Sequence, residues 1–158
     1  MVLTSDLPFA HIGFVVPGLE EAIARFERLG ITFMTPRTVH VERLVEDGQE
    51  SSLDLRVVFS HQGPPQWELL EAVGDGIYGS QHCGGLHHIA VLDPDPENRI
   101  AALERAGFRF TAAQYRPDGS MIVGYLDPAD LDGVRIELLH EPVQEAILAW
   151  IAGEEATP

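Results

Sequence analysis

Two histidines and two glutamates recur in a way that could support metal chemistry in this 158-residue sequence. His11 and His88 each open a short apolar run, and Glu68 and Glu137 each lie inside a later apolar run. A charged side chain is costly to bury unless it is paired or ligates a metal. Two imidazoles and two carboxylates suit a divalent Zn, Ni, Co, Mn or Fe(II) ion. We therefore predict that the four side chains converge on one metal, with room left for substrate and for proton transfer.

Each of these residues also has a purely structural interpretation. A lone histidine is often a core residue bonded to the backbone, and a glutamate in a strand often faces solvent. Recurrence at equivalent positions favours the metal site for all four. Tyr125 lies on a strand expected to face the same space, where it would donate to a substrate oxygen or simply pack. Strand alternation points His87 to the face opposite His88, so we expect a structural or rim-facing role for it.

The histidines belong to an ungapped internal repeat. Residues 9–33 and 86–110 align at a constant offset of 77 and are identical at ten of 25 positions. Each copy begins with a strand-like apolar run and a Pro-containing turn, and continues with the three-and-four spacing of an amphipathic helix. Gly30 and Gly107 follow the last periodic residues, as left-handed helix terminators do.

The rest of each copy is strand-like, so each half reads as βαβββ. The predicted strands are 39–45, 53–60 and 67–73 in the first half, and 112–115, 121–127 and 134–140 in the second. We therefore predict an α+β fold, with two tandem βαβββ modules forming a mixed sheet and a C-terminal helix. The expected single domain covers 1–158, with modules at about 8–74 and 86–141, a Gly-rich linker at 75–85 and the helix at 142–152.

Composition excludes several classes of function. The formal net charge is −15, and all ten basic residues are arginine. Such a chain is a poor partner for nucleic acid or for an anionic membrane surface, and it lacks the lysine that Schiff-base chemistry needs. The single cysteine excludes an internal disulfide and fits a reducing compartment. Without a recognisable signal segment or an apolar run of spanning length, the sequence predicts a cytoplasmic protein.

The sequence resembles the vicinal oxygen chelate superfamily over about Phe9 to Pro142. The resemblance rests on the tandem modules, on the histidine that opens each first strand, and on last strands that read Glu-Leu-Leu from Glu68 and from Glu137. This superfamily includes glyoxalase I, methylmalonyl-CoA epimerase, extradiol dioxygenases, and the fosfomycin and bleomycin resistance proteins. The stretch GGLHHIA at 84–90 is particularly similar to the epimerase-like branch, whereas the His/Glu/His/Glu set is closer to the glyoxalase I pattern.

The resemblance implies an open, cup-shaped sheet, a homodimer and a divalent metal. The implied ligands are His11, Glu68, His88 and Glu137. It further implies a metal-dependent isomerase, epimerase or lyase that binds a small molecule through vicinal oxygens and forms an enolate-like intermediate. Glu137 or Glu68 would detach from the metal and act as the base. The alternatives are a non-catalytic small-molecule or antibiotic-binding protein and an Fe(II) extradiol-type dioxygenase, which needs only two histidines and one carboxylate.

Overall fold

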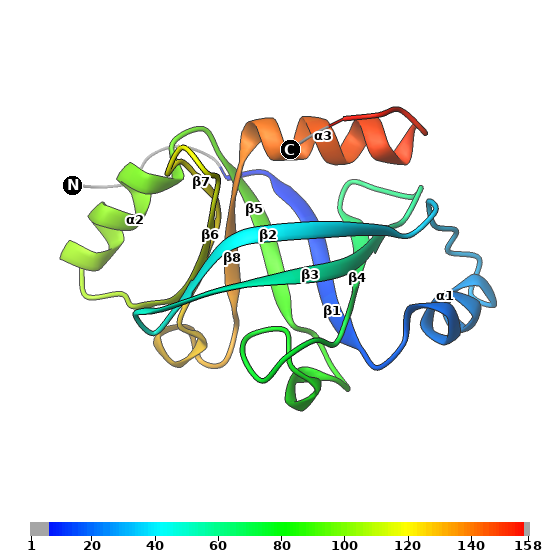
Figure 1. Ribbon diagram of the computed structural model, residues 1–158, viewed down its shortest axis with the longest axis horizontal. Coiled ribbons are helices and arrows are strands. Elements are labelled where there is room, and N and C mark those ends of the chain that lie inside the picture. The colour runs from blue at the N-terminus through cyan, green and yellow to red at the C-terminus, as the bar shows by residue number, and fades with distance from the viewer. Residues whose placement is uncertain (1–6, 157–158) are drawn as a thin grey trace.

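The computed structural model describes residues 7–156; residues 1–6 and 157–158 of the predicted domain lie outside the described residues. The two halves follow one another with the same order of a strand, a helix and three strands (Figure 1). The first half contains β1 (Phe9–Val16), α1 (Leu19–Glu27), β2 (Arg37–Glu46), β3 (Gln49–Phe59) and β4 (Gln66–Glu71). The second half contains β5 (His88–Asp93), α2 (Pro96–Arg105), β6 (Phe110–Tyr115), β7 (Met121–Leu126) and β8 (Ile136–His140), followed by α3 (Glu141–Ile151).

The eight strands form one mixed sheet in the order β1-β4-β3-β2-β6-β7-β8-β5. Strands β1 and β4 are parallel, as are β5 and β8, and the other pairs are antiparallel. The predicted α+β class and curved mixed sheet are confirmed, but the sheet is a closed barrel and not an open cup. It closes because Arg43–Glu46 of β2 pair with Ala112–Tyr115 of β6, which satisfies backbone groups that an open edge would expose.

The two outer helices are set by local sequence signals. Helix α1 packs against β3 and β4, and α2 packs against β7 and β8. The Asp95 carboxylate accepts a hydrogen bond from the Asn98 backbone N–H at 3.2 Å, and thereby caps the first turn of α2. Gly30 and Gly107 have φ values of +86° and +96°, so the predicted left-handed helix terminators are confirmed.

The third helix takes a different place, across one end of the barrel (Figure 1). It follows β8 without a connecting loop and spans Glu141–Ile151, against an expected range of 142–152. Its apolar residues Val143, Ile147 and Trp150 are buried and belong to the same core as Val41 and Val57 of the barrel. The predicted helix thus contributes to the interior on which the site is built.

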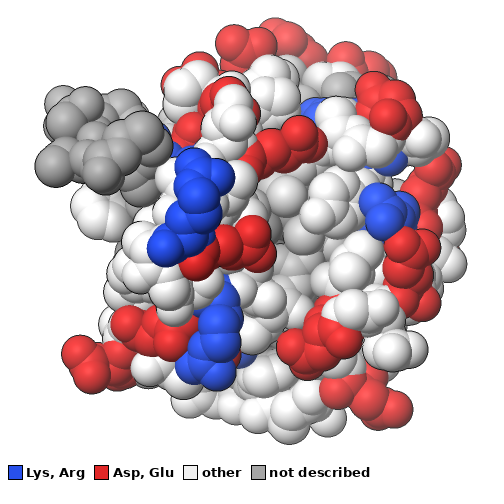
Figure 2. Space-filling model, turned by 90° about the vertical axis from the view of Figure 1, so that its left-hand side faces the viewer, with Lys and Arg blue, Asp and Glu red and all other residues white. Residues whose placement is uncertain are grey.

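Acidic side chains are spread widely over the surface. On the face shown in Figure 2, carboxylates are scattered among uncharged side chains, and the arginines gather in a few patches beside carboxylates. Several arginines form ion pairs, such as Arg43 with Glu50 at 2.6 Å and Arg109 with Asp130 at 2.8 Å. No helix within residues 7–156 is long and apolar enough to cross a membrane.

Candidate functional site

The strand register brings the two repeated histidines face to face. Strands β1 and β5 are antiparallel, with Ile12 opposite Ile89 at the centre. His11 therefore lies opposite Ala90, and His88 lies opposite Gly13. Because the offset between the copies is 77 for the histidines and for these small residues alike, the arrangement is close to two-fold symmetric.

The small residues make room for the imidazoles. A Cβ atom added to Gly13 would overlap the ring of His88, so the backbone of β1 must be bare at this point. Neither Gly13 nor Ala90 is predicted from the sequence as a site residue. The signal that would have found them is a small residue two positions after each repeated histidine, in His11-Ile12-Gly13 and its counterpart His-Ile-Ala.

The two glutamates come from the strands on either side of this pair. Strand β4 runs parallel to β1 and places Glu68 beside Gly13. Strand β8 runs parallel to β5 and places Glu137 beside Ala90. The four predicted residues thus lie on four adjacent strands, in the order β4-β1-β5-β8, and the structure brings all of them together. We call His11, Glu68, His88 and Glu137 the His/Glu cluster.

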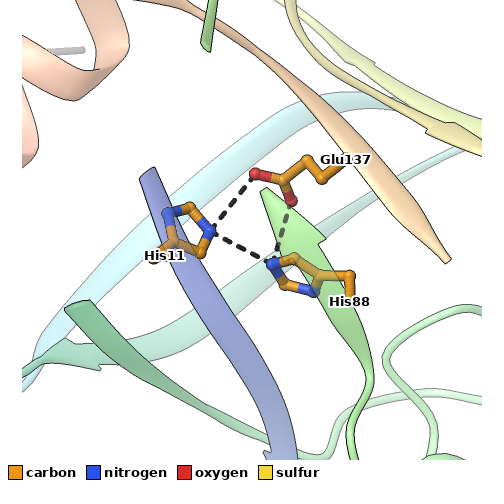
Figure 3. Close-up of side chains that lie close together, drawn as sticks. All are labelled: His11, His88 and Glu137. Carbon is orange, nitrogen blue, oxygen red and sulfur yellow. Dashed lines mark hydrogen bonds and ion pairs between the residues drawn. The ribbon is translucent and has the colours of Figure 1, made fainter. Parts of the chain in front are cut away.

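Distances within the His/Glu cluster are short, and all four side chains are buried. The Nε2 atoms of His11 and His88 are 3.1 Å apart. Glu137 lies 3.3 Å from His11 Nε2 and 3.4 Å from His88 Nε2 (Figure 3). Glu68 Oε2 lies 3.3 Å and 3.1 Å from the same two nitrogens. The ligand atoms of His11, His88 and Glu137 all lie within 4.8 Å of one another. Glu68 contacts both imidazoles from β4, the strand on the other side of the histidine pair from β8.

These separations fit a divalent ion. For metal–ligand bonds of about 2.1 Å, neighbouring ligands of an octahedral or tetrahedral ion lie about 3.0–3.4 Å apart. The buried Glu68 Oε2 makes no hydrogen bond among the described residues, although it lies within ion-pair distance of both imidazole nitrogens. A buried, unbonded carboxylate oxygen is costly without a cation to offset its charge. The donor set, the spacing and this orphaned oxygen therefore match a metal site.

The electrostatics of the metal-free cluster favour ion pairs. Burial alone would lower the pKa of His11, but the charges of Glu68 and Glu137 outweigh it and raise this pKa to about 10. Burial likewise opposes ionisation of the two glutamates, yet the nearby imidazoles hold both carboxyl pKa values below their usual range. A proton on His11 thus occupies the place of a cation, and both carboxylates are ionised at neutral pH.

His87 is buried behind His88 and does not lie at the rim. Its Nε2 lies 2.7 Å from the carbonyl oxygen of Ile77, which can only accept, so this nitrogen carries a proton. Burial lowers the pKa of His87 to about 3, so its ring is neutral and its Nδ1 accepts. The partner at 2.9 Å is His88 Nδ1, which must donate. His88 Nε2 therefore faces the cluster as the nitrogen that would coordinate a metal ion.

The surroundings of the two glutamates differ in polarity. Tyr125 pairs with Glu137 across β7 and β8, whereas Phe59 pairs with Glu68 across β3 and β4. The Tyr125 hydroxyl lies 2.9 Å from that of Tyr78. Burial and the charge of Glu137 raise the pKa of both phenols, so both are protonated at neutral pH. The Glu137 side of the site therefore offers hydroxyl donors, and the Glu68 side offers an apolar ring.

Tyr78 is a site residue that the sequence did not reveal. It lies in the Gly-rich connection predicted as a linker, where it is almost fully buried, and it has no counterpart in the repeat. Gln114 of β6 donates to its hydroxyl at 2.5 Å. Both residues line the same interior cavity as Tyr125, His11, and the two glutamates of the cluster. Only the path of the connection under the barrel brings Tyr78 there.

Comparisons with known proteins agree with this architecture. A family model described as the Glyoxalase/Bleomycin resistance protein/Dioxygenase superfamily matches residues 10–125. A hypothetical protein from Bacillus halodurans C-125 has a similar structure, with a TM-score of 0.64 and 18% identity over 86% of this chain and 95% of that chain. Methylmalonyl-CoA epimerase from Mycobacterium tuberculosis has a TM-score of 0.57 and 22% identity, over 89% of this chain and 92% of that chain. A methylmalonyl-CoA epimerase in complex with methylmalonyl-CoA and NH4+ has a TM-score of 0.61 and 20% identity, over 86% of this chain and 95% of that chain. No curated protein matches the sequence.

Proposed function

Because the chain belongs to the Glyoxalase/Bleomycin resistance protein/Dioxygenase superfamily, we propose that it is a metal-dependent isomerase, epimerase or lyase. The His/Glu cluster would hold one divalent ion, and the substrate would be a small molecule with two vicinal oxygens. The observation that carries the proposal is the convergence of two imidazoles and two carboxylates at 3.1–3.4 Å inside a buried cavity.

The residues of the cavity can perform a proton transfer. A divalent ion bound at the cluster would polarise two substrate oxygens and lower the pKa of the neighbouring C–H group. Glu137, ionised at neutral pH, would remove that proton, and the electron pair would stay on the substrate as an enolate. In an isomerisation the protonated Glu137 would return the same proton to the neighbouring carbon, and in an epimerisation Glu68, after taking a proton from solvent, would deliver it to the opposite face of the enolate. In a lyase reaction the electron pair would expel a leaving group instead.

The asymmetry of the cavity favours Glu137 as the base. Its cross-strand neighbour Tyr125 carries a protonated hydroxyl that would donate to a substrate oxygen as negative charge develops there. Phe59, the equivalent neighbour of Glu68, cannot donate. Charge that develops on the Glu137 side is therefore better stabilised, and we assign the first proton abstraction to Glu137.

The test combines metal identification with hydrogen–deuterium exchange. Elemental analysis of the purified protein is expected to find about one divalent ion per chain. A panel of 2-oxo acids, 2-hydroxy ketones and methylmalonyl-CoA in D2O is then followed by NMR for exchange at the carbon next to the oxygens. Glu137→Gln is expected to lower the exchange rate at least about 100-fold. Glu104→Gln on the exposed face of α2 is the matched control. A protein that neither holds nor takes up a divalent ion, or a Glu137→Gln variant that exchanges at the native rate, would contradict the proposal.

A second candidate function is supported by the lining of the cavity, most of which is aliphatic. A non-catalytic protein that sequesters an apolar small molecule would need such a lining and no proton transfer. It would bind its ligand equally well before and after Glu137→Gln and would promote no exchange in D2O. The homodimer, the cytoplasmic location, the single-domain organisation and the origin of the two halves as tandem modules stay predictions from the sequence.

A further inference from the structure

Helix α3 forms one wall of the cavity that contains the His/Glu cluster. Val143, Ile147 and Trp150 line this cavity together with His11 and Glu137. Because α3 follows β8 directly, the strand that carries Glu137 continues into the helix that covers the end of the barrel (Figure 1). A ligand bound at the cluster would therefore lie beside the inner face of this helix.

The position of α3 is fixed at its far end. The indole Nε1 of Trp150 donates to the carbonyl oxygen of Ala156 at 2.7 Å. The guanidinium of Arg37 on β2 lies 5.2 Å from the centre of the Trp150 ring and also donates to the carbonyl oxygen of Glu154 at 3.1 Å. A cation over an indole and a buried apolar face both oppose detachment of the helix. The covering of the cavity is thus a packed part of the fold.

The cavity beside α3 is small and is apolar away from the cluster. Its volume is about 90 Å³. Drug-sized pockets are larger, at about 300–1,000 Å³. Beyond the cluster and its tyrosines the lining is mainly aliphatic, and it includes Val39, Val41, Leu55, Val57, Leu139 and Ile147.

No arginine among residues 7–156 lines the cavity, and the chain has no lysine. Two arginines, Arg37 and Arg116, line an adjoining groove that shares Val39, Ile122 and Trp150 with the cavity. Arg37 donates to the carbonyl oxygen of Glu154 at 3.1 Å. Arg116 donates to Ser120 Oγ at 3.3 Å and to the Met121 carbonyl oxygen at 3.2 Å. A phosphate-bearing carrier group would therefore find no arginine or lysine side chain inside the cavity.

From these features we infer the substrate class, an inference that rests on the proposed function of the cluster. The substrate is a compact molecule in which a chelating pair of oxygens carries one short hydrocarbon group, without a large or polyanionic carrier. The oxygens face the His/Glu cluster, and the hydrocarbon group lies against the aliphatic lining under α3. Ile147 and Trp150 determine specificity, because they set the greatest length that this group can reach.

The test uses n-alkyl hydroxamates, which present two vicinal oxygens on a hydrocarbon chain of chosen length. The protein is loaded with Co(II), and the visible spectrum of the ion is followed during titration with the series from acetohydroxamate to octanohydroxamate. Each added methylene is expected to improve affinity about fourfold while the chain fits. Affinity is then expected to fall at least about tenfold between butanohydroxamate and octanohydroxamate, because the longer chain meets α3.

Two variants locate the limit on the helix. Ile147→Ala is expected to move the best-bound hydroxamate to a longer chain, since it removes bulk from the inner face of α3. Leu148→Ala is the matched control, because Leu148 is the next residue on the same helix and is 45% exposed. Should Ile147→Ala fail to fold, Ile147→Val removes a single methyl group and is expected to shift the limit in the same direction.

The outcomes separate this inference from the proposed function. Equal binding of butanohydroxamate and octanohydroxamate by the native protein, or an unchanged length limit in a folded Ile147 variant, would overturn the assignment of substrate size to α3. Failure of every hydroxamate to perturb the Co(II) spectrum would instead overturn the chelating site itself, and with it the proposed function. A limit on hydroxamate chain length that moves in the Ile147 variant and stays at the native length in Leu148→Ala supports the inference.

Discussion

His87 and His88 are neighbours in the sequence, but only His88 points its Nε2 into the cluster. The Ile77 carbonyl holds the proton on His87 Nε2, and His87 Nδ1 in turn accepts the Nδ1 proton of His88. This chain of two hydrogen bonds fixes the tautomer of His88 that a metal ion requires. His87 is thus a positioning residue that acts through His88.

Replacement of His87 tests this role. His87→Ala is expected to weaken divalent-metal affinity by roughly 10–100-fold, because His88 is then free to carry its proton on Nε2. His87→Asn, whose side-chain oxygen can accept from His88, is expected to restore part of the loss. Affinity is measured by competition with a chelator, and the His88 tautomer by ¹⁵N NMR. Native affinity in a folded His87→Ala variant with an unchanged tautomer would rule the role out.

The raised pKa of His11 predicts a pH dependence of metal binding. A metal-bound imidazole must be deprotonated, whereas His11 of the metal-free protein keeps its proton up to a pKa of about 10. The apparent metal affinity is therefore expected to rise about tenfold per pH unit between about pH 7 and 9 and to level off above about pH 10. Isothermal titration in buffers of different ionisation enthalpy would count about one proton released per ion at pH 8. Affinity independent of pH in this range would show that His11 is neutral in the free protein.

The same pKa has the opposite effect on the stability of the metal-free protein. The folded-state pKa of His11 lies above the ordinary value of 6.5, so protonation stabilises the fold. That contribution is fully present below about pH 6.5 and is lost as the pH rises through about 10. Metal-free protein should therefore become less stable across the range in which metal binding becomes stronger.

At the scale of elements, the site depends on how closely β1 and β5 approach. Gly13 pairs with His88, and its missing side chain is what allows the imidazole to lie over the strand. Gly13→Ala is expected to displace His88 and to abolish measurable metal binding, because the added carbon would occupy the space of the ring. Gly85→Ala is the matched control, since a Cβ atom there meets nothing within 4 Å. Binding by Gly13→Ala within a few-fold of the native protein would show that β1 can shift without disturbing the cluster.

At the scale of the whole molecule, the cluster joins the two halves of the chain. His11 and Glu68 come from the first half, and His88 and Glu137 come from the second, so a bound ion would link both. Removal of the metal by a chelator is expected to lower the melting temperature. The stabilisation that is lost should amount to about 2.7 kcal/mol when the free metal had been held at 100 times its Kd. Thermal unfolding with and without chelator measures this effect, and Glu137→Gln should show a smaller shift. An unchanged melting temperature in native protein of known metal content would contradict the link.

Closure of the barrel and the placement of α3 also belong to this scale. The pairing of β2 with β6 depends on residues 43–46 and 112–115, which lie far apart in the sequence and show no local signal for one another. Helix α3 forms one wall of the cavity, and the spacing of its apolar residues in the sequence predicts its apolar face. Which surface that face covers depends on the direct junction of β8 with α3 and on the contact of Arg37 with the Trp150 ring.

The sequence by itself determined the repeat, the order of elements in each half and the four residues of the cluster. It could do so because a symmetric site draws the same residue types from both copies, and the copies can be aligned without their structure. The tertiary structure decided the features that break the symmetry. Tyr78 comes from the connection between the halves, and Tyr125 stands where the first half has Phe59. Contacts of this kind join residues distant in the chain that have no repeated counterpart, and only the folded barrel brings them together.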